Sequence, residues 1–316
     1  MRNKRLTFYY SLTILIILIS AAVFIGSVFI SPINLSETGS LILWQIRLPR
    51  VLLAALVGAM LAVSGAALQA VLRNPLADPY ILGVSAGGSL GAAAAMILSL
   101  PFLLVSPIAF ICAMICVLFI YQLSKIGGRV RPSTLILAGV AVSSFVGAIL
   151  GFLMITSNKL QSVYFWILGS FQYAVWESVG AASLYALIGI SIIYVFYKQL
   201  NVLMLSEEEA LSLGVDVPKI RLIILSAASL LAAVAASLAG MIGFVGLLVP
   251  HMIRMFAPDH KYLIPLSMVA GACLMVFADL IARVIIFPSE IPVGIVTAVL
   301  GAPFFIWLLR KGRGIQ

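Results

Sequence analysis

Charge is scarce in this chain of 316 residues: Asp, Glu, Lys and Arg make up only 9% of it, and just 10 residues are acidic. Soluble domains carry charge on about a quarter of their residues. Hydrophobic residues make up 63% of the chain, and the mean hydropathy is +1.22. This composition excludes an ordinary soluble domain and predicts a membrane protein.

Cysteine, histidine and nucleotide-binding motifs are also sparse. Cys112, Cys116 and Cys273 lie in apolar runs with no His or Cys at metal-ligand spacing. We interpret them as packing residues, and we predict no metal site and no cofactor bound by this chain. The chain lacks a G-x-x-x-x-G-K-[ST] loop. We therefore predict that it does not hydrolyse nucleotides and is not an enzyme.

Long apolar runs fill most of the chain and predict an all-α membrane protein of about ten transmembrane helices, with residues 1–316 as one domain. Pro75, Pro79 and Gly83 predict a broken start for the third helix. The predicted spans are 6–30, 46–72, 84–100, 101–125, 133–155, 179–197, 222–238, a short span ending near 251–254, 262–286 and 292–309.

The basic residues predict the orientation. With both termini in the cytoplasm, 15 of the 19 Lys and Arg fall on the cytoplasmic side, and only Arg47, Arg50, Lys159 and Arg283 fall outside. This bias follows the positive-inside rule. It explains the net charge of +9 without a nucleic-acid partner.

One cytoplasmic segment, residues 198–221, is unusually acidic. It holds Glu207, Glu208, Glu209 and Asp216, four of the 10 acidic residues. We predict a short amphipathic helix that Gly214 ends and that a separate cytoplasmic protein grips. The alternative is a solvated acidic loop.

The outer arginines allow two interpretations. Arg47 and Arg50 flank Pro49, and Arg283 follows Asp279 by four residues, the spacing of an ion pair on one helix face. The arginines could extend to lipid headgroups. They could also form a docking site for an acidic partner outside the membrane.

The middle of each predicted span lacks Asp, Glu, Lys and Arg. Ion-coupled carriers normally keep a titratable group there. The missing titratable group therefore favours a transporter that is driven by a separate ATPase. A self-sufficient secondary transporter or channel is the alternative.

Several long blocks then identify a resemblance that covers nearly the whole chain. They are WQIRLPRVLLAALVGAMLAVSGAALQAVLRNPLADPYILGVSAG, LILAGVAVSS, LSEEEALSLGVDV, GFVGLLVPHMIRM, DHKYLIPLS and IPVGIVTAVLGAPFFIWLL. In this order they resemble the permease subunits of ABC importers for iron-siderophore, haem and vitamin B12, the FecCD type of type II importer. The resemblance implies a bundle like that of the vitamin B12 importer permease, in the cell (inner) membrane. It also implies a dimer with a second copy or a similar permease, two cytoplasmic ATPase subunits that use ATP, and an extracytoplasmic substrate-binding protein.

The resemblance also assigns roles to residues. Segment 199–219 corresponds to the ATPase-coupling segment, although Glu209 replaces the first alanine of an E-A-A-x-x-x-G pattern. Arg47, Arg50 and Arg283 match arginines that meet carboxylates of the binding protein. The coupling residues are Glu207, Glu208, Glu209, Ala210 and Gly214; the path and gate residues are Ser133, Thr134, Gly139, Ser143, Ser144 and Gly147. For the small residues of span 133–155, tight helix packing that involves Gly147 and Gly151 is the competing interpretation.

The function that the resemblance implies is a path for an iron complex, most simply a ferric siderophore, delivered by the binding protein. Cobalamin and haem stay open as cargo.

Overall fold

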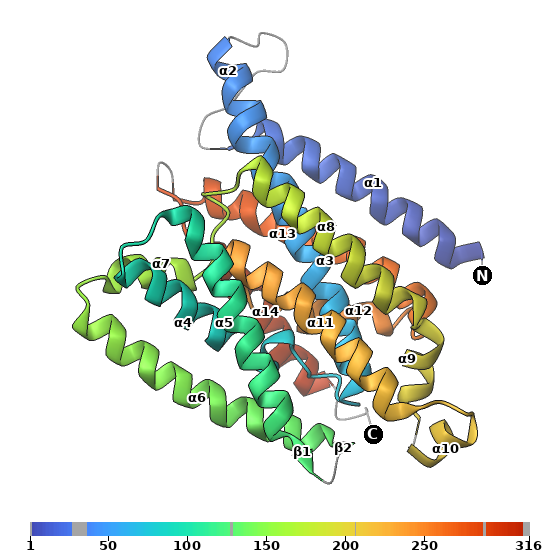
Figure 1. Cartoon of the computed structure of the whole chain (residues 1–316). Coiled ribbons are helices and arrows are strands. Elements are labelled where there is room, and N and C mark those ends of the chain that lie inside the picture. The colour runs from blue at the N-terminus through green and yellow to red at the C-terminus, as the bar shows by residue number, and fades with distance from the viewer. Residues whose placement is uncertain (1, 27–36, 127–128, 206, 287–288, 312–316) are drawn as a thin grey trace.

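The computed structural model describes residues 2–26, 37–126, 129–205, 207–286 and 289–311. In this part of the chain, seven helices are long and apolar enough to cross a membrane, and three shorter apolar helices accompany them, so the prediction of about ten spans is confirmed. Figure 1 shows them as one bundle of roughly aligned helices. They are α1 (Arg2–Phe24), α3 (Leu48–Val71), α4 (Val84–Ile97), α5 (Phe102–Leu123), α6 (Pro132–Thr156), α8 (Trp176–Val195), α11 (Val217–Ala239), α12 (Val245–Arg254), α13 (His260–Val284) and α14 (Val293–Lys311).

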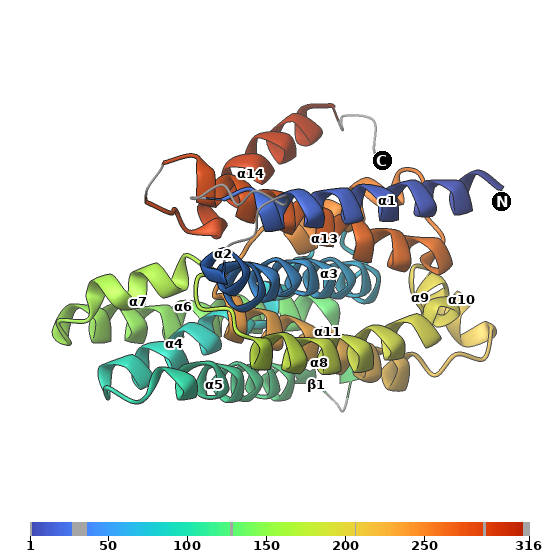
Figure 2. The same cartoon turned by 90° about the horizontal axis from the view of Figure 1, so that it is seen from above.

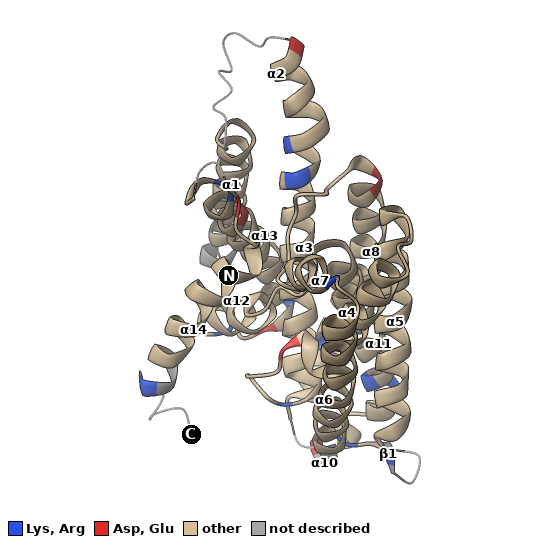
Figure 3. Ribbon diagram, turned by 90° about the vertical axis from the view of Figure 1, so that its left-hand side faces the viewer, with Lys and Arg blue, Asp and Glu red and all other residues tan. Residues whose placement is uncertain are grey.

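Short elements gather at the two ends of the bundle. We call one end the α2 end, after α2 (Glu37–Leu41), and the opposite end the α10 end, after α10 (Glu207–Ser212); Figure 3 shows the two helices at opposite extremes. The other short elements are η1 (Ile42–Arg47), η2 (Pro79–Leu82), α7 (Leu160–Ile167), α9 (Tyr197–Leu203), β1 (Lys125–Ile126) and β2 (Arg129–Val130). The antiparallel pair β1–β2 is a minimal hairpin at the α10 end, in an otherwise helical described chain.

Helix α3 is the centre of the bundle, because it packs against α8, α11, α12 and α13 and most of its residues are buried. Two glycine pairs allow this close packing. A Cβ on Gly58 would collide with the carbonyl oxygen of Gly271 in α13, and a Cβ on Gly65 would collide with that of Gly246 in α12. Small residues at helix crossings bring backbones into direct contact, which drives helix association in lipid. Helices α1 and α6 lie at the periphery and are mostly exposed (Figure 2).

The structure corrects two boundaries. The polar segment before the second span is helical from Glu37, and Leu48 N–H reaches back five residues to the carbonyl of Leu43. This π-type turn precedes Pro49, which has no N–H to continue the regular ladder. The segment between the fifth and sixth spans, expected to be a loop, contains α7, and α8 begins at Trp176.

The broken start of the third span is confirmed. Asp78 caps η2 by accepting from Tyr80 N–H at 2.9 Å, and Gly83 then turns the chain with φ +74° before α4 begins. Arg73, just after α3, also has a positive φ of 50°. Burial raises the pKa of Asp78 to about 6, although the Tyr80 N–H opposes this shift.

Candidate functional site

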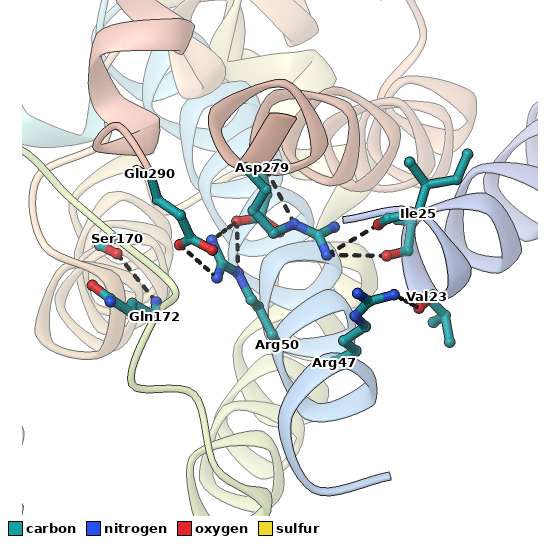
Figure 4. A network of polar contacts seen from close by, with 10 residues as sticks. Val23, Ile25, Arg47, Arg50, Ser170, Gln172, Asp279 and Glu290 are labelled. Carbon is teal, nitrogen blue, oxygen red and sulfur yellow. Dashed lines mark hydrogen bonds and ion pairs between the residues drawn. The ribbon is translucent and has the colours of Figure 1, made fainter. Parts of the chain in front are cut away.

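An ion network links α3 to α13 at the α2 end. Arg50 donates from Nε and Nη2 to Oδ1 of Asp279, at 3.0 and 2.9 Å, and from Nη1 to Oε2 of Glu290 at 2.8 Å. Arg283 Nε lies 3.1 Å from Oδ2 of the same Asp279. We call these four residues, Arg50, Asp279, Arg283 and Glu290, the ionic cluster (Figure 4). Its formal charges cancel, which is what burial of so many ions requires.

The outer arginines also fasten the end of α1. Arg47 donates to the carbonyl oxygens of Val23 and Phe24 at 3.1 and 2.8 Å. Arg283 donates to the carbonyl oxygen of Ala22 at 3.1 Å. The last carbonyls of a helix have no partner within it, so these guanidinium groups cap α1 (Figure 4).

These contacts decide one of the interpretations made from the sequence. Arg47, Arg50 and Arg283 are only 5%, 7% and 3% exposed, so the alternative that they extend to lipid headgroups is wrong. The pair Asp279–Arg283 at i, i+4 is confirmed. Docking of a partner stays a prediction. In this conformation the three arginines donate hydrogen bonds to carboxylates and carbonyl oxygens of the chain itself.

The acidic segment forms two helices, α9 and α10, and α10 lies at the extreme end of the bundle (Figure 1). Gly214, at φ +74°, ends α10. Gly214 N–H bonds to the Leu211 carbonyl at 2.9 Å, and Val215 N–H bonds to that of Ala210 at 3.1 Å. This pair of bonds is a Schellman motif, so the predicted glycine cap is confirmed in its geometry.

Helix α10 buries one side and exposes the other. Ala210 is fully buried, whereas Glu209 is exposed. Leu211 and Leu213 are each 62% exposed. The backbones of Glu207 and Glu208 form the first turn of α10, and their side chains lie outside the described part of the chain. A short capped helix that presents two leucines beside acidic residues can bind a groove in another protein.

Helix α9 joins this segment to the bundle through polar contacts at Asn201 and at the Leu203 carbonyl. Asn201 donates to Oδ1 of Asp259 at 2.8 Å, and its own Oδ1 accepts from the His260 N–H at 3.0 Å and lies 2.6 Å from His260 Nδ1. Arg73 Nε, at the end of α3, donates to the Leu203 carbonyl at 2.7 Å. We call these contacts the α9 clasp. It fixes α9 to both α3 and α13, and nothing in the sequence pattern pointed to Asn201.

The residues predicted for the path divide into two groups. Gly139 is buried against η2, where a Cβ would meet the carbonyl oxygen of Ile81, so it packs within the chain. A Cβ on Gly147 or on Gly151 would have no neighbour within 4 Å, and Ser144 is exposed. Ser143 is half-buried. The small-residue face of α6 therefore stays open in this chain and is free for a path or for a second permease.

The residues predicted for the gate lie next to the β1–β2 hairpin. Ser133 is exposed in the first turn of α6. Thr134 donates to the carbonyl oxygens of Ser124 and Arg131, at 3.2 and 2.8 Å. These contacts tie the start of α6 to the end of α5.

A cavity of about 1280 Å³, absent from the sequence predictions, opens at the α2 end. The aromatic rings of Phe102, Tyr173 and Trp166 line it beside amides such as Gln161 and Gln172. Glu290 lines it too, so one residue belongs to both the cavity and the ionic cluster. The run of aromatic and polar residues at 159–178 was the available signal.

Metal ligands do not gather in the described residues: no group of three or more His, Cys, Asp or Glu could hold an ion there. Cys116 is buried, and Cys112 and Cys273 are half-buried.

Comparison with known families decides the identity. The model of the FecCD transport family matches residues 13–311. The chain belongs to the FecCD transport family. It is a multi-pass membrane protein and the permease of an ABC importer, whose ATPase activity lies in a separate subunit.

The names of curated FecCD relatives state several different cargoes. The chain is 43% identical over 277 residues to the cobalamin import system permease protein BtuC of Halobacterium salinarum, covering 87% of this chain and 74% of that one. It is 41% identical over 327 residues to the hemin transport system permease protein HmuU of Yersinia pestis, covering 98% and 97%. It is 40% identical over 279 residues to the Fe(3+)-citrate import system permease protein YfmD of Bacillus subtilis, covering 87% and 83%.

Solved structures support the FecCD fold. An inward-facing metal-chelate type ABC transporter matches with a TM-score of 0.89 and 32% identity, covering 96% of this chain and 98% of that one. PsaBC of Streptococcus pneumoniae, solved in complex with a Fab, matches with a TM-score of 0.60 at 20% identity, covering 82% and 89%, and shows the fold alone.

Proposed function

We propose that this FecCD permease forms the path for a ferric siderophore, delivered by an extracytoplasmic binding protein and driven by two cytoplasmic ATPase subunits. Cobalamin or haem as cargo of the same machinery is the alternative. The metal-chelate class of the structural relative and the iron-citrate relative favour an iron chelate. The aromatic and amide lining of the cavity at the α2 end suits a bulky chelate that enters with its metal already enclosed.

The observation that carries the proposal is α10. It lies at one extreme of the bundle, is capped by a Schellman motif and presents Leu211 and Leu213 outward. An exposed apolar pair is unfavourable in water and indicates a protein contact. The positive-inside count assigns this end to the cytoplasm, where the ATPase is. Residues 199–219 thus act as the coupling segment, with Glu207, Glu208, Glu209, Ala210 and Gly214 as its centre.

The ionic cluster at the other end is the proposed docking point. Acidic residues of a binding protein could replace the carboxylate of Glu290 on Arg50, because Glu290 is the more exposed of the two acids there, at 24% against 1% for Asp279. Arg47 and Arg283 lie in the same region. Docking would then alter Glu290 and the cavity that it lines.

The open face of α6 supports pairing with a second permease. Gly147 lies on this face with Val140 and Ser144, which are exposed and stand seven and three residues before it on the helix. Two such faces could enclose a path, with Ser133 and Thr134 at its cytoplasmic gate and Ser143, Ser144 and Gly147 in its wall, whereas Gly139 packs against η2 within the chain.

The test is uptake by proteoliposomes that hold the permease, its ATPase and its binding protein. We expect uptake of a ferric siderophore that requires ATP on the side of the membrane that holds the ATPase, and much weaker uptake of haem and cobalamin. Preferred uptake of haem or cobalamin would reject the cargo. Uptake by the permease alone under an ion gradient would reject the ATP-driven class and favour a secondary transporter.

A further inference from the structure

A groove of about 310 Å³ lies between three helices at the α10 end, away from the path and from α10 itself. Phe8 and Tyr9 line it from α1, Tyr194 from α8, and Lys261, Tyr262 and Pro265 from α13. Figure 2 shows the starts of α1 and α13 and the end of α8 at the same end of the bundle. Nothing in the proposed transport cycle uses this groove.

The lining residues of α1, α8 and α13 lie near the helix ends that meet at the α10 end, which gives the groove one depth in the membrane. Lys261 is the second residue of α13, whose 25 residues span about 37 Å. Tyr194 is the last but one of the 20 residues of α8, which span about 30 Å. Tyr9 is in the first turn of the apolar segment of α1, Leu6–Phe24. Because the hydrocarbon layer is about 30 Å thick, all three lie at its boundary with the headgroups. Tyrosine is typical of this layer.

The groove opens to the surroundings of the bundle. Tyr9 is 64% exposed, and Lys261 is exposed as well. Along α1 the exposed side chain of Ile16 lies two turns beyond Tyr9 on the same face, toward the membrane centre. An apolar opening at this depth in a membrane protein faces lipid, not water.

The lining of the groove combines polar and apolar groups. Lys261 and three tyrosines line it together with Phe8, Pro265 and Leu266, and on α13 the apolar pair Pro265 and Leu266 lies one turn beyond Lys261 and Tyr262. Lys261 Nζ lies 5.8 Å from the centre of the Tyr262 ring, which holds the ammonium group near the groove. Asp259 is not among the residues that line the groove, and its Oδ1 accepts from Asn201 and from the Lys261 N–H.

We propose that this groove binds an anionic glycerophospholipid of the leaflet at the α10 end, with the phosphate at Lys261 and an acyl chain along Pro265, Leu266 and Phe8. The volume of the groove is at the lower end of the range for ligand pockets, about 300 to 1000 Å³, so the groove encloses only part of the lipid molecule. Basic pockets between transmembrane helices bind anionic headgroups in this way. Such a lipid connects α1, which packs on α13 but is mostly exposed, to α8.

Native mass spectrometry of the transporter complex measures the binding. The complex is released from nanodiscs made with equal amounts of phosphatidylglycerol and phosphatidylcholine. We expect phosphatidylglycerol to be retained about five-fold over phosphatidylcholine, because one lysine near the surface contributes about 1 kcal/mol. Lys261→Gln is expected to abolish this preference, and Lys261→Arg to keep it.

Lys125→Gln is the matched control, because it removes one exposed lysine, also near a tyrosine ring, from the same end of the bundle outside the groove. Equal retention of the two lipids by the unsubstituted complex would overturn the proposal, as would an equal loss in Lys125→Gln. A further arm adds soluble glycerol 3-phosphate. If it displaces the bound lipid at millimolar concentration, the site binds phosphate alone and the lipid assignment is wrong.

Discussion

Removal of Asp279 tests the ionic cluster most directly. Asp279 is 1% exposed and is the common partner of Arg50 and Arg283, which are themselves buried. In Asp279→Ala, Arg50 keeps Glu290 and Arg283 keeps the Ala22 carbonyl, but the cluster gains a net positive charge. Breaking a buried ion pair from one side costs about 3–5 kcal/mol. We expect the lower part of this range, about 3 kcal/mol, because both arginines retain one acceptor.

The measurement is the thermal unfolding of the purified transporter. At about 2–4 °C for each kcal/mol, the melting temperature is expected to fall by roughly 6–12 °C. Glu177→Gln is the matched control, since Glu177 is an exposed carboxylate in the first turn of α8, also lining the cavity. It should change the melting temperature by less than about 2 °C, as expected of about 0.5 kcal/mol at the surface.

A double substitution separates charge from shape. Asp279→Ala combined with Arg283→Met removes one ion of each sign, so its destabilisation should be smaller than the sum of the two single changes. If Asp279→Ala unfolds at the same temperature as Glu177→Gln, the pairs do not stabilise the chain. The reasoning on the cluster is then refuted.

Three further changes test other parts of the chain. The double substitution Leu211→Ser and Leu213→Ser should weaken association with the ATPase at least about ten-fold in a pull-down titration, while the melting temperature stays unchanged. Leu76→Ser, which alters another exposed leucine, is the control and should have little effect on this association. Asn201→Leu removes the contacts of α9 to α13, so it should lower the amount of cargo transported per ATP several-fold while ATP hydrolysis continues. An unchanged amount of cargo per ATP would exclude a coupling role for the clasp. Asp78 has a pKa raised to about 6 in the folded chain, so its burial destabilises the fold once the carboxylate ionises. At a pH above about 6, Asp78→Asn should therefore raise the melting temperature, and at a pH below about 4 it should leave the melting temperature unchanged. A higher melting temperature of the variant at the lower pH would contradict this assignment.

The sequence predicted most of the helices because lipid imposes a simple rule: a spanning helix must be long and apolar. The broken start of the third span and the cap at Gly214 were also predictable, because Pro79 has a fixed φ and no N–H, and because Gly83 and Gly214 readily adopt the positive φ of a turn or a helix end. The helical segment from Glu37 was not, since its polar residues resemble a loop and its helix is π-type before Pro49.

The surroundings of the arginines could not be predicted from local spacing. Arg283 and its partner Asp279 are four residues apart, and this pair was predicted. Arg50 meets Asp279 and Glu290 across 229 and 240 residues of chain, a relation that only the folded bundle creates. Asn201 was missed for the same reason, because its partners lie 58 and 59 residues away. A single reversal such as Arg50→Glu therefore perturbs the fold as well as any docking.

The α9 clasp and the ionic cluster together close a frame that extends through the membrane. Its two uprights are α3, about 36 Å long for 24 residues, and α13. Asn201 and the Arg73–Leu203 bond join them at one end, and the Arg50–Asp279 pair joins them at the other. Between these joints the uprights touch at Gly58 and Gly271, which limits bending. If α9 moves while the hydrogen bonds of the clasp hold, α3 and α13 must slide past each other, because they already touch at Gly58 and Gly271. We expect this displacement to strain the Arg50–Asp279 pair, at the opposite end of the bundle from α9.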